Sequence, residues 1–138
     1  MQTDLEFTEF IETGTGRLTP RAVHDLLPEL PEIRARIETA EAPGFPRLKE
    51  QLQFLAEVVE ALGNHRDHDL PYTASLEAVF AITYFARDVD LIPDFLTDIG
   101  LTDDATVAVT VLQRHAQQYA DFAQRRGIDW STITPDAR

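Results

Sequence analysis

The chain has 138 residues, and its 12 Lys and Arg against 24 Asp and Glu give a formal net charge of −12. A surface this negative repels phosphate backbones and anionic lipids, so we expect cations or basic proteins as partners and no nucleic acid. The absence of cysteine excludes disulfides, thiolate metal sites and cysteine nucleophiles.

The first third of the chain predicts short helices that wrap around the rest. Thr3 and Glu6 have the spacing of a capping box for a helix that runs to about Ile11 and ends at the Thr-Gly-Thr-Gly stretch that follows. Thr19 and Pro20 start the next helix, because threonine is a good N-cap and proline is favoured in the first turn. Further prolines divide the segment up to residue 45 into short pieces (Pro28, Pro31 and Pro43).

Three longer helices are predicted at about 46–63, 74–87 and 103–126. In the first, apolar residues recur every three or four positions on one face (Leu48, Leu52, Leu55, Val59 and Leu62). The second is apolar on all sides, which is typical of a central, buried helix. The third has its own apolar face and ends with Arg-Arg-Gly, the usual signals of a helix C-terminus (Leu112, His115, Tyr119 and Phe122, then Arg125, Arg126 and Gly127).

These patterns predict one all-α domain over residues 1–138, a small compact helical bundle with three main helices. Residues 1–45 would wrap a helical core at 46–126, and residues 127–138 would form an irregular tail held to the body by Trp130. The longest apolar run, Ala78–Ala86, is much shorter than the roughly 20 residues that a transmembrane helix needs. The N-terminus also lacks a signal-peptide pattern, so we expect a cytoplasmic protein.

The connector between the second and third long helices carries the most distinctive residues. From Asp90 to Asp104 it reads DLIPDFLTDIGLTDD, and no basic residue lies between Arg87 and Arg114. Aspartate is favoured in turns, in helix caps and as an oxygen ligand of hard cations. The apolar residues of the connector predict that it folds against the body, with the acids projecting from it.

This segment resembles the YkvA-like family, a bacterial domain of unknown function. The resemblance covers roughly Ala74 to Val111. It rests on a motif at 84–104 made of an aromatic helix end, an Asp-Leu-Ile-Pro-Asp-Phe run, a glycine and an Asp-Asp pair (Tyr84, Phe85, Asp90–Phe95, Gly100, Asp103 and Asp104). Three positions depart from the family pattern (Asp88, Thr97 and Thr102). The resemblance implies a small helical domain, and it supplies no established activity, ligand or catalytic residue.

Two interpretations of the aspartates remain open. In one, four of them form an oxygen-rich site for Mg²⁺, Ca²⁺ or Mn²⁺ (Asp90, Asp94, Asp103 and Asp104). In the other, Asp90 caps a turn of the connector, Asp94 bonds to the backbone or to Arg87, and Asp103 and Asp104 face the dipole of the next helix. The spacing does not match an EF-hand loop, and the capping interpretation is favoured.

The remaining polar residues do not favour an enzyme, and we expect no catalytic residue. His65 and His68 are spaced as a metal-binding pair but lack a third ligand, so we interpret them as part of a solvated loop. His115 lies on an apolar helix face, where we expect a hydrogen bond to a backbone carbonyl, Tyr72 or Tyr84. The two serines lack the context of a nucleophile (Ser75 and Ser131).

The favoured function is a non-catalytic binding or regulatory domain whose partner has a basic or amphipathic surface. The helix at 74–86 is the expected docking surface, unless its apolar side chains belong to the core. The alternative is divalent-cation binding by the connector, with metal-dependent hydrolysis as a remote extension. The sequence does not fix the oligomeric state.

Overall fold

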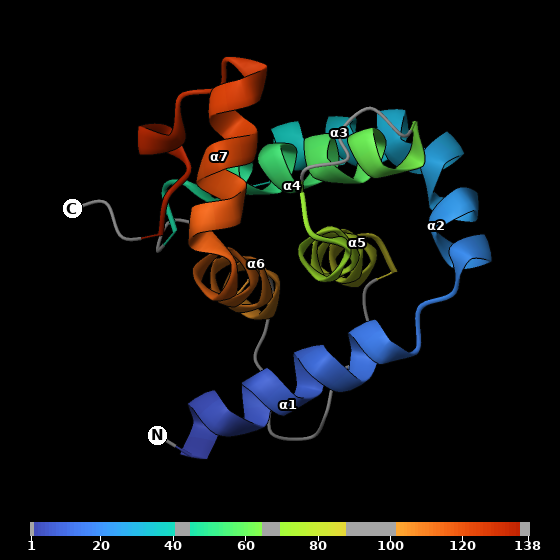
Figure 1. The fold of residues 1–138 in the computed structure, drawn as a ribbon, viewed down its shortest axis with the longest axis vertical. Helices are drawn as coiled ribbons and strands as arrows, with labels where there is room; N and C mark the ends of the chain where they lie inside the picture. The colour runs from blue at the N-terminus through green and yellow to red at the C-terminus, as the bar shows by residue number, and fades with distance from the viewer. Residues whose placement is uncertain (1, 41–44, 65–69, 88–101, 136–138) are drawn as a thin grey trace.

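A computed structural model describes residues 2–40, 45–64, 70–87 and 102–135, and within these ranges the chain is helical without strands (Figure 1). None of the described helices is long and apolar enough to cross a membrane. The all-α prediction is therefore confirmed for the described residues. In chain order the elements are α1 (Gln2–Gly16), α2 (Pro20–Leu26), the 3-10 helix η1 (Leu27–Glu29), α3 (Leu30–Thr39), α4 (Leu48–Gly63), α5 (Tyr72–Arg87), α6 (Thr102–Arg114), α7 (Ala116–Arg126) and the 3-10 helix η3 (Trp130–Thr132).

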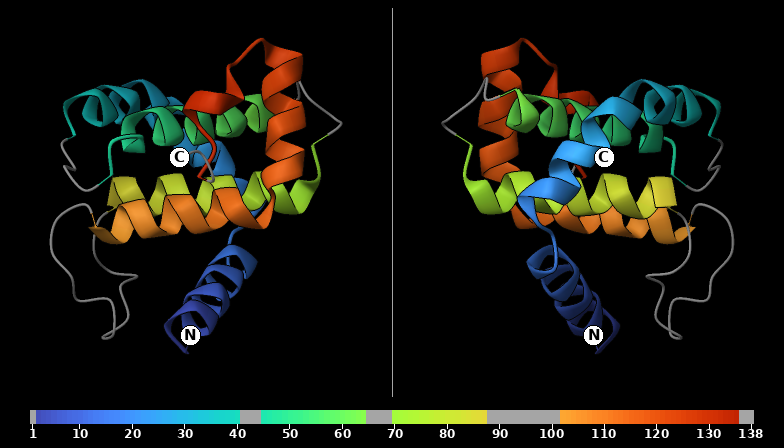
Figure 2. Two further views of the ribbon diagram at one scale, coloured as in Figure 1. Left: turned by 90° about the vertical axis from the view of Figure 1, so that its left-hand side faces the viewer. Right: turned by 90° about the vertical axis from the view of Figure 1, so that its right-hand side faces the viewer.

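Helix α5 occupies the centre of the fold, with α4, α6 and α1 packed around it (Figure 1). Helices α5 and α6 lie side by side, and α3 packs on α4 (Figure 2). Ala78, Val79 and Ile82 of α5 are fully buried. The apolar side chains at 74–86 therefore form the core, which corrects the expectation that this helix offers a docking surface.

Helix α1 is longer than the sequence predicted. It was expected to end near Ile11, but it continues through the Thr-Gly-Thr-Gly stretch to Gly16. A Cβ atom on Gly14 would overlap the ring of Phe80 in α5. Gly14 is therefore present to let two helices approach closely, and it does not terminate α1. The proposed capping box of Thr3 and Glu6 involves side chains outside those that the structure describes.

The long helix predicted at 103–126 is two helices, α6 and α7, so the prediction of one continuous helix was wrong. His115 separates them with a φ of −131° and a ψ of 35°, and α7 turns away from α6 (Figure 2). Leu112 before the corner and Tyr119 and Phe122 after it are all fully buried. The apolar spacing continues across the corner because both helices face the same core, which is why the pattern did not reveal the break.

Other helix ends follow the predicted signals. The Oγ1 atom of Thr19 accepts a hydrogen bond from the amide of Ala22 at 3.1 Å, so Thr19 caps α2 as expected. Gly127 ends α7 with a φ of 71°, a left-handed conformation that glycine adopts without strain. The amide of Ile128 then donates to the carbonyl of Ala123 at 2.8 Å.

The C-terminal segment is held against α4, as predicted for Trp130. The indole of Trp130 packs edge-on against the ring of Phe54, with centroids 5.5 Å apart. The Nε2 atom of Gln51 donates a buried hydrogen bond of 3.0 Å to the carbonyl of Ile133. The segment is more regular than expected, because it contains the 3-10 turn η3.

Candidate functional site

The candidate cation ligands of the connector lie outside the described residues or at their edge. Asp90 and Asp94 fall within 88–101 and are outside the description. Asp103 and Asp104 belong to the first turn of α6, which begins at Thr102, one residue before the predicted start. Their side chains are not described, so the choice between cation binding and helix capping stays a prediction. His65 and His68 also lie outside the described ranges.

Within the described part of the chain, no three His, Asp or Glu residues converge as a set of metal ligands. The most pronounced electrostatic feature there is a buried carboxylate, Glu77 of α5, whose side chain is 2% exposed. Arg114 at the end of α6 binds both of its oxygens: Nε donates to Oε1 at 2.8 Å and Nη2 to Oε2 at 2.9 Å. This two-point contact fixes the orientation of both side chains and compensates the buried charge.

Residues from α1 and from the α6–α7 corner complete this group. The Nη2 atom of Arg114 also donates to Glu12 of α1 at 3.1 Å. The Nε2 atom of His115 lies 3.2 Å from Oε1 of Glu77, and the ring of His115 contacts Tyr119 edge-on. These five residues connect α1, α5, α6 and α7, with Glu77 inside and Glu12 at the surface. We call them the Glu77 cluster (Glu12, Glu77, Arg114, His115 and Tyr119).

The ionisation of the cluster follows from its surroundings. Burial alone would raise the pKa of Glu77, but the adjacent His115 and the two hydrogen bonds from Arg114 outweigh it and hold the pKa below the ordinary value of 4.5. Burial raises the pKa of Tyr119 well above 10.0, and the charge of Glu77 adds to this effect. At neutral pH the carboxylate stays charged and the phenol stays protonated. Neither group is poised for proton transfer near neutral pH, so the cluster is suited to structural support.

Sequence reasoning missed this cluster. The sequence pattern placed Glu77 in a buried helix. A single acid in an otherwise apolar helix indicates that the acid has a buried partner, and this signal could have identified the cluster. His115 was expected to bond to a backbone carbonyl, Tyr72 or Tyr84, and its neighbours are instead Glu77 and Tyr119. The sequence could not show that the corner at His115 turns its ring toward α5.

A separate feature is an open groove of about 380 Å³ that lies on α4 between α3 and the C-terminal segment. This volume falls within the range of roughly 300–1,000 Å³ that is typical of ligand sites. Its apolar lining comes from α4 and from the C-terminal segment, and its rim is charged. We call it the α4 groove; its lining residues are Phe54, Ile128 and Ile133, with Arg34, Glu38, Lys49, Glu50, Gln53 and Glu57.

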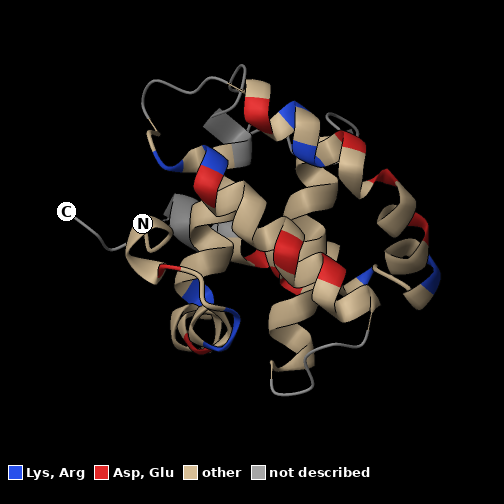
Figure 3. Ribbon diagram, turned by 90° about the horizontal axis from the view of Figure 1, so that it is seen from above, with Lys and Arg blue, Asp and Glu red and all other residues tan. Residues whose placement is uncertain are grey.

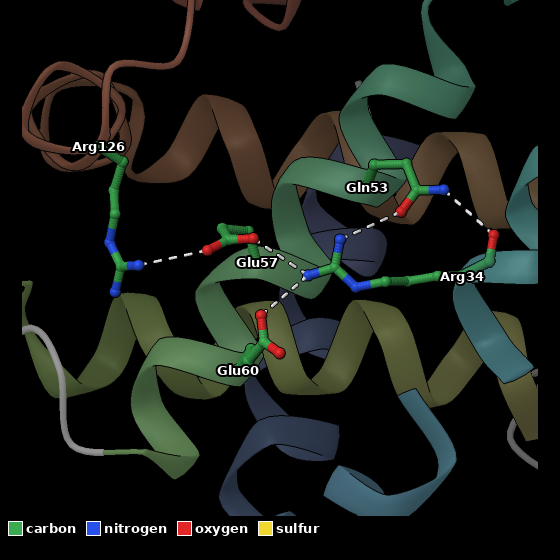
Figure 4. Close-up of polar contacts among 5 residues, drawn as sticks. All are labelled: Arg34, Gln53, Glu57, Glu60 and Arg126. Atoms are coloured by element: carbon green, nitrogen blue, oxygen red, sulfur yellow. Dashed lines mark hydrogen bonds and ion pairs between the residues drawn. The ribbon is translucent and has the colours of Figure 1, made fainter. Parts of the chain in front are cut away.

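A polar network holds one wall of the α4 groove in place (Figure 4). Arg34 of α3 donates to Glu57 at 3.2 Å and to Glu60 at 3.4 Å, both on α4. Gln53 of α4 donates to the backbone carbonyl of Arg34 at 3.1 Å. From the opposite side, Arg126 of α7 donates to Glu57 at 3.3 Å. Because Glu57 is held from both α3 and α7, the width of the groove is set by the fold.

Residues 74–110 match the model of a family described as "Protein of unknown function (DUF1232)". The match covers α5, the aspartate connector and most of α6, whereas the α4 groove lies outside it. No curated protein and no solved structure matches the chain.

Proposed function

We propose that this protein is a non-catalytic binding domain that holds a basic, amphipathic segment of a partner protein in the α4 groove. The observation that carries the proposal is the combination of an apolar floor with two exposed carboxylates on the rim, Glu38 and Glu50, which outnumber the one exposed cation among the lining residues, Lys49. A segment that alternates apolar and basic side chains complements both features. The partner is of the class expected from the sequence, but the proposed docking surface lies on α4, whereas the sequence suggested α5.

The overall charge supports the same partner class. The chain carries a formal net charge of −12, so a basic segment is attracted from a distance and an acidic one is repelled. In the view of Figure 3, acidic and basic residues alternate along several of the helices. Long-range attraction therefore raises the association rate, and the rim of the groove determines where the segment binds.

The commitment of Glu77 to its partners supports a non-catalytic role. Glu77 is the one buried acid among the described residues, and Arg114 donates hydrogen bonds to both of its carboxylate oxygens. A carboxylate that serves as a general acid or base needs a pKa near the working pH, whereas the pKa of Glu77 is lowered. Its contacts stabilise the packing of α5 against α6 and the α6–α7 corner.

The test uses two synthetic helical peptides with leucine on the apolar face, one with lysine and the other with glutamate on the polar face. Trp130 is the only tryptophan and packs on Phe54 of the groove, so its fluorescence reports occupancy. We expect a saturable change with the lysine peptide and none with the glutamate peptide. Raising the ionic strength from about 0.1 M to about 1 M shortens the Debye length from about 10 Å to about 3 Å and should weaken binding.

A matched pair of variants locates the site. Glu50→Lys alters the rim of the groove, and Glu9→Lys makes the same charge change on an exposed position of α1. We expect Glu50→Lys to weaken the binding of the lysine peptide by roughly fivefold, and Glu9→Lys to have a much smaller effect on binding. Equal effects of the two variants, or no binding of the lysine peptide, would overturn the proposal.

Cation binding by the connector is the second candidate function. The family match includes all four candidate ligands, which supports a shared role for that segment (Asp90, Asp94, Asp103 and Asp104). A cation at a hundred times its dissociation constant stabilises the fold by about 2.7 kcal/mol. We expect a selective rise in melting temperature with Mg²⁺, Ca²⁺ or Mn²⁺ after chelator treatment, lost in Asp94→Asn. An equal melting temperature with and without each ion would indicate that the aspartates cap the helix and the turns and bind no cation.

The finer family assignment is also our proposal. We place the matched segment in the YkvA-like family, supported by the motif at 84–104 and by its position within the matched residues 74–110. We also propose that residues 1–138 form one domain, in which residues 1–45 wrap a helical core at 46–126 and residues 127–138 form a tail.

A further inference from the structure

The α4 groove is built partly from residues that follow Gly127. Of the apolar side chains in its described lining, Phe54 belongs to α4, whereas Ile128 and Ile133 come from the segment after α7. We call residues 128–135 the strap. Because the strap supplies two of these three side chains, the groove has its apolar floor only while the strap lies against α4.

Two side chains at the N-terminal end of α4 hold the strap by its backbone. The Nη1 atom of Arg47 donates to the carbonyl of Ser131 at 2.8 Å and to the carbonyl of Thr134 at 3.1 Å. Gln51, one turn further along, donates to the carbonyl of Ile133 at 3.0 Å, and this bond is buried. Since all three acceptors are backbone oxygens, the bonds fix where the strap lies along α4.

Arg47 and Gln51 are outside the described lining of the groove, so they act on an occupant through the strap. Arg47 is the N-cap residue of α4, but its side chain is directed to the strap and not to the capping of that helix. We infer that Arg47 and Gln51 are positioning residues of the α4 groove, which set its affinity by keeping the strap docked. The inference rests on the proposed function and adds a means by which binding is controlled.

Docking of the strap and binding of an occupant should support each other. An occupant that contacts Ile128 and Ile133 binds the docked form, so its apparent affinity falls in proportion to the docked fraction. By the same linkage, an occupant stabilises the docked strap. The amides of Ile133 and Thr134 both donate to the carbonyl of Trp130 within the strap, so their hydrogen exchange reports its local opening.

The test measures the exchange of these two amides and the affinity of the lysine peptide in the full chain. Arg47→Met keeps a long apolar stem but removes both hydrogen bonds to the strap. We expect it to speed exchange in the strap by about tenfold, to leave exchange in the buried helix α5 unchanged, and to weaken peptide binding by about tenfold. Arg47→Lys keeps the charge and a donor, and it should restore a large part of both losses. In the unmodified chain, the peptide should slow exchange of both strap amides.

Charge alone predicts the opposite effect on the peptide. Arg47→Met removes a positive charge, which by itself strengthens the attraction of a basic peptide. Arg17→Met makes the same charge change at an exposed position directly after α1, and it should leave strap exchange unchanged and binding unchanged or slightly stronger. Equal binding by the two variants, or unchanged strap exchange in Arg47→Met, would overturn the inference alone. If the unmodified chain binds no lysine peptide, the proposed function and the inference both fail.

Discussion

Glu77 and Arg114 are 37 positions apart in the sequence and meet inside the fold through two hydrogen bonds of 2.8 and 2.9 Å. The contact joins the central helix α5 to the last residue of α6. His115, the next residue, begins the corner into α7 and also lies beside Glu77. One carboxylate therefore sets both the end of α6 and the direction of the chain that follows.

Removing Arg114 should be more damaging than replacing the whole pair. Arg114→Met leaves the charge of Glu77 buried without its main partner, and we expect a loss of about 3 kcal/mol in the free energy of unfolding. The double variant Glu77→Leu with Arg114→Met removes both charges and should recover a large part of this loss. Urea unfolding of the two variants measures the difference; a double variant less stable than Arg114→Met would contradict the account.

The cluster should make stability depend on acid. The pKa of Glu77 is lowered in the folded protein, so its carboxylate stabilises the fold above the unfolded value near 4.5. That contribution is lost as the pH falls from about 4.5 through the lower folded pKa. We expect Glu77→Gln to show a smaller decrease in unfolding free energy between about pH 7 and about pH 3 than the unmodified protein. Parallel curves for the two proteins would argue against the lowered pKa.

Tyr119 should give the opposite dependence at high pH. Its hydroxyl is buried, donates to the carbonyl of Ala74 at 2.6 Å, and has a raised pKa. A raised folded pKa stabilises the fold below the unfolded value near 10 and loses this effect as the pH rises toward the folded value. We expect unfolding free energy to fall above about pH 10, with a shallower fall in Tyr119→Phe. Chemical unfolding at several alkaline pH values measures both slopes.

Two glycines of α1 provide a matched test of helix packing. Gly14→Ala places a methyl group against the ring of Phe80, and we expect a destabilisation of about 1–3 kcal/mol. Gly16→Ala enters open space, and it should be neutral or stabilise by up to about 1 kcal/mol through helix propensity. Thermal and urea unfolding measure the change in stability of both variants. Similar changes would mean that α1 is not packed closely on α5.

The sequence predicted the elements whose signals are local. Apolar residues at intervals of three or four positions located α4, and a nearly continuous apolar run located α5, whose side chains are buried on most sides. Thr19 and Gly127 marked helix ends correctly, because capping depends on neighbouring backbone atoms. The end of α1 was predicted too early because Gly14 is needed for the close contact with Phe80 of α5, which lies 66 positions further along the sequence.

The sites depend on contacts that no local pattern contains. The partners of Glu77 are Arg114 and His115 at the α6–α7 corner, and Arg114 in turn binds Glu12 of α1, so the cluster exists only once these elements pack. The α4 groove combines α3, α4 and residues after Gly127, and its rim charges look like ordinary surface residues in the sequence. The aspartate connector stood out because its residues are contiguous, and it lies outside the described ranges except at its end.

The most direct test of the binding proposal is an amide NMR titration of the full chain with the lysine–leucine peptide. The account predicts that resonance shifts concentrate at the α4 groove, around Glu38, Glu50, Phe54 and Ile128, and that they saturate. Shifts confined to residues away from the groove, such as those of the connector, or no shifts at all, would contradict the assignment of the groove as the binding site.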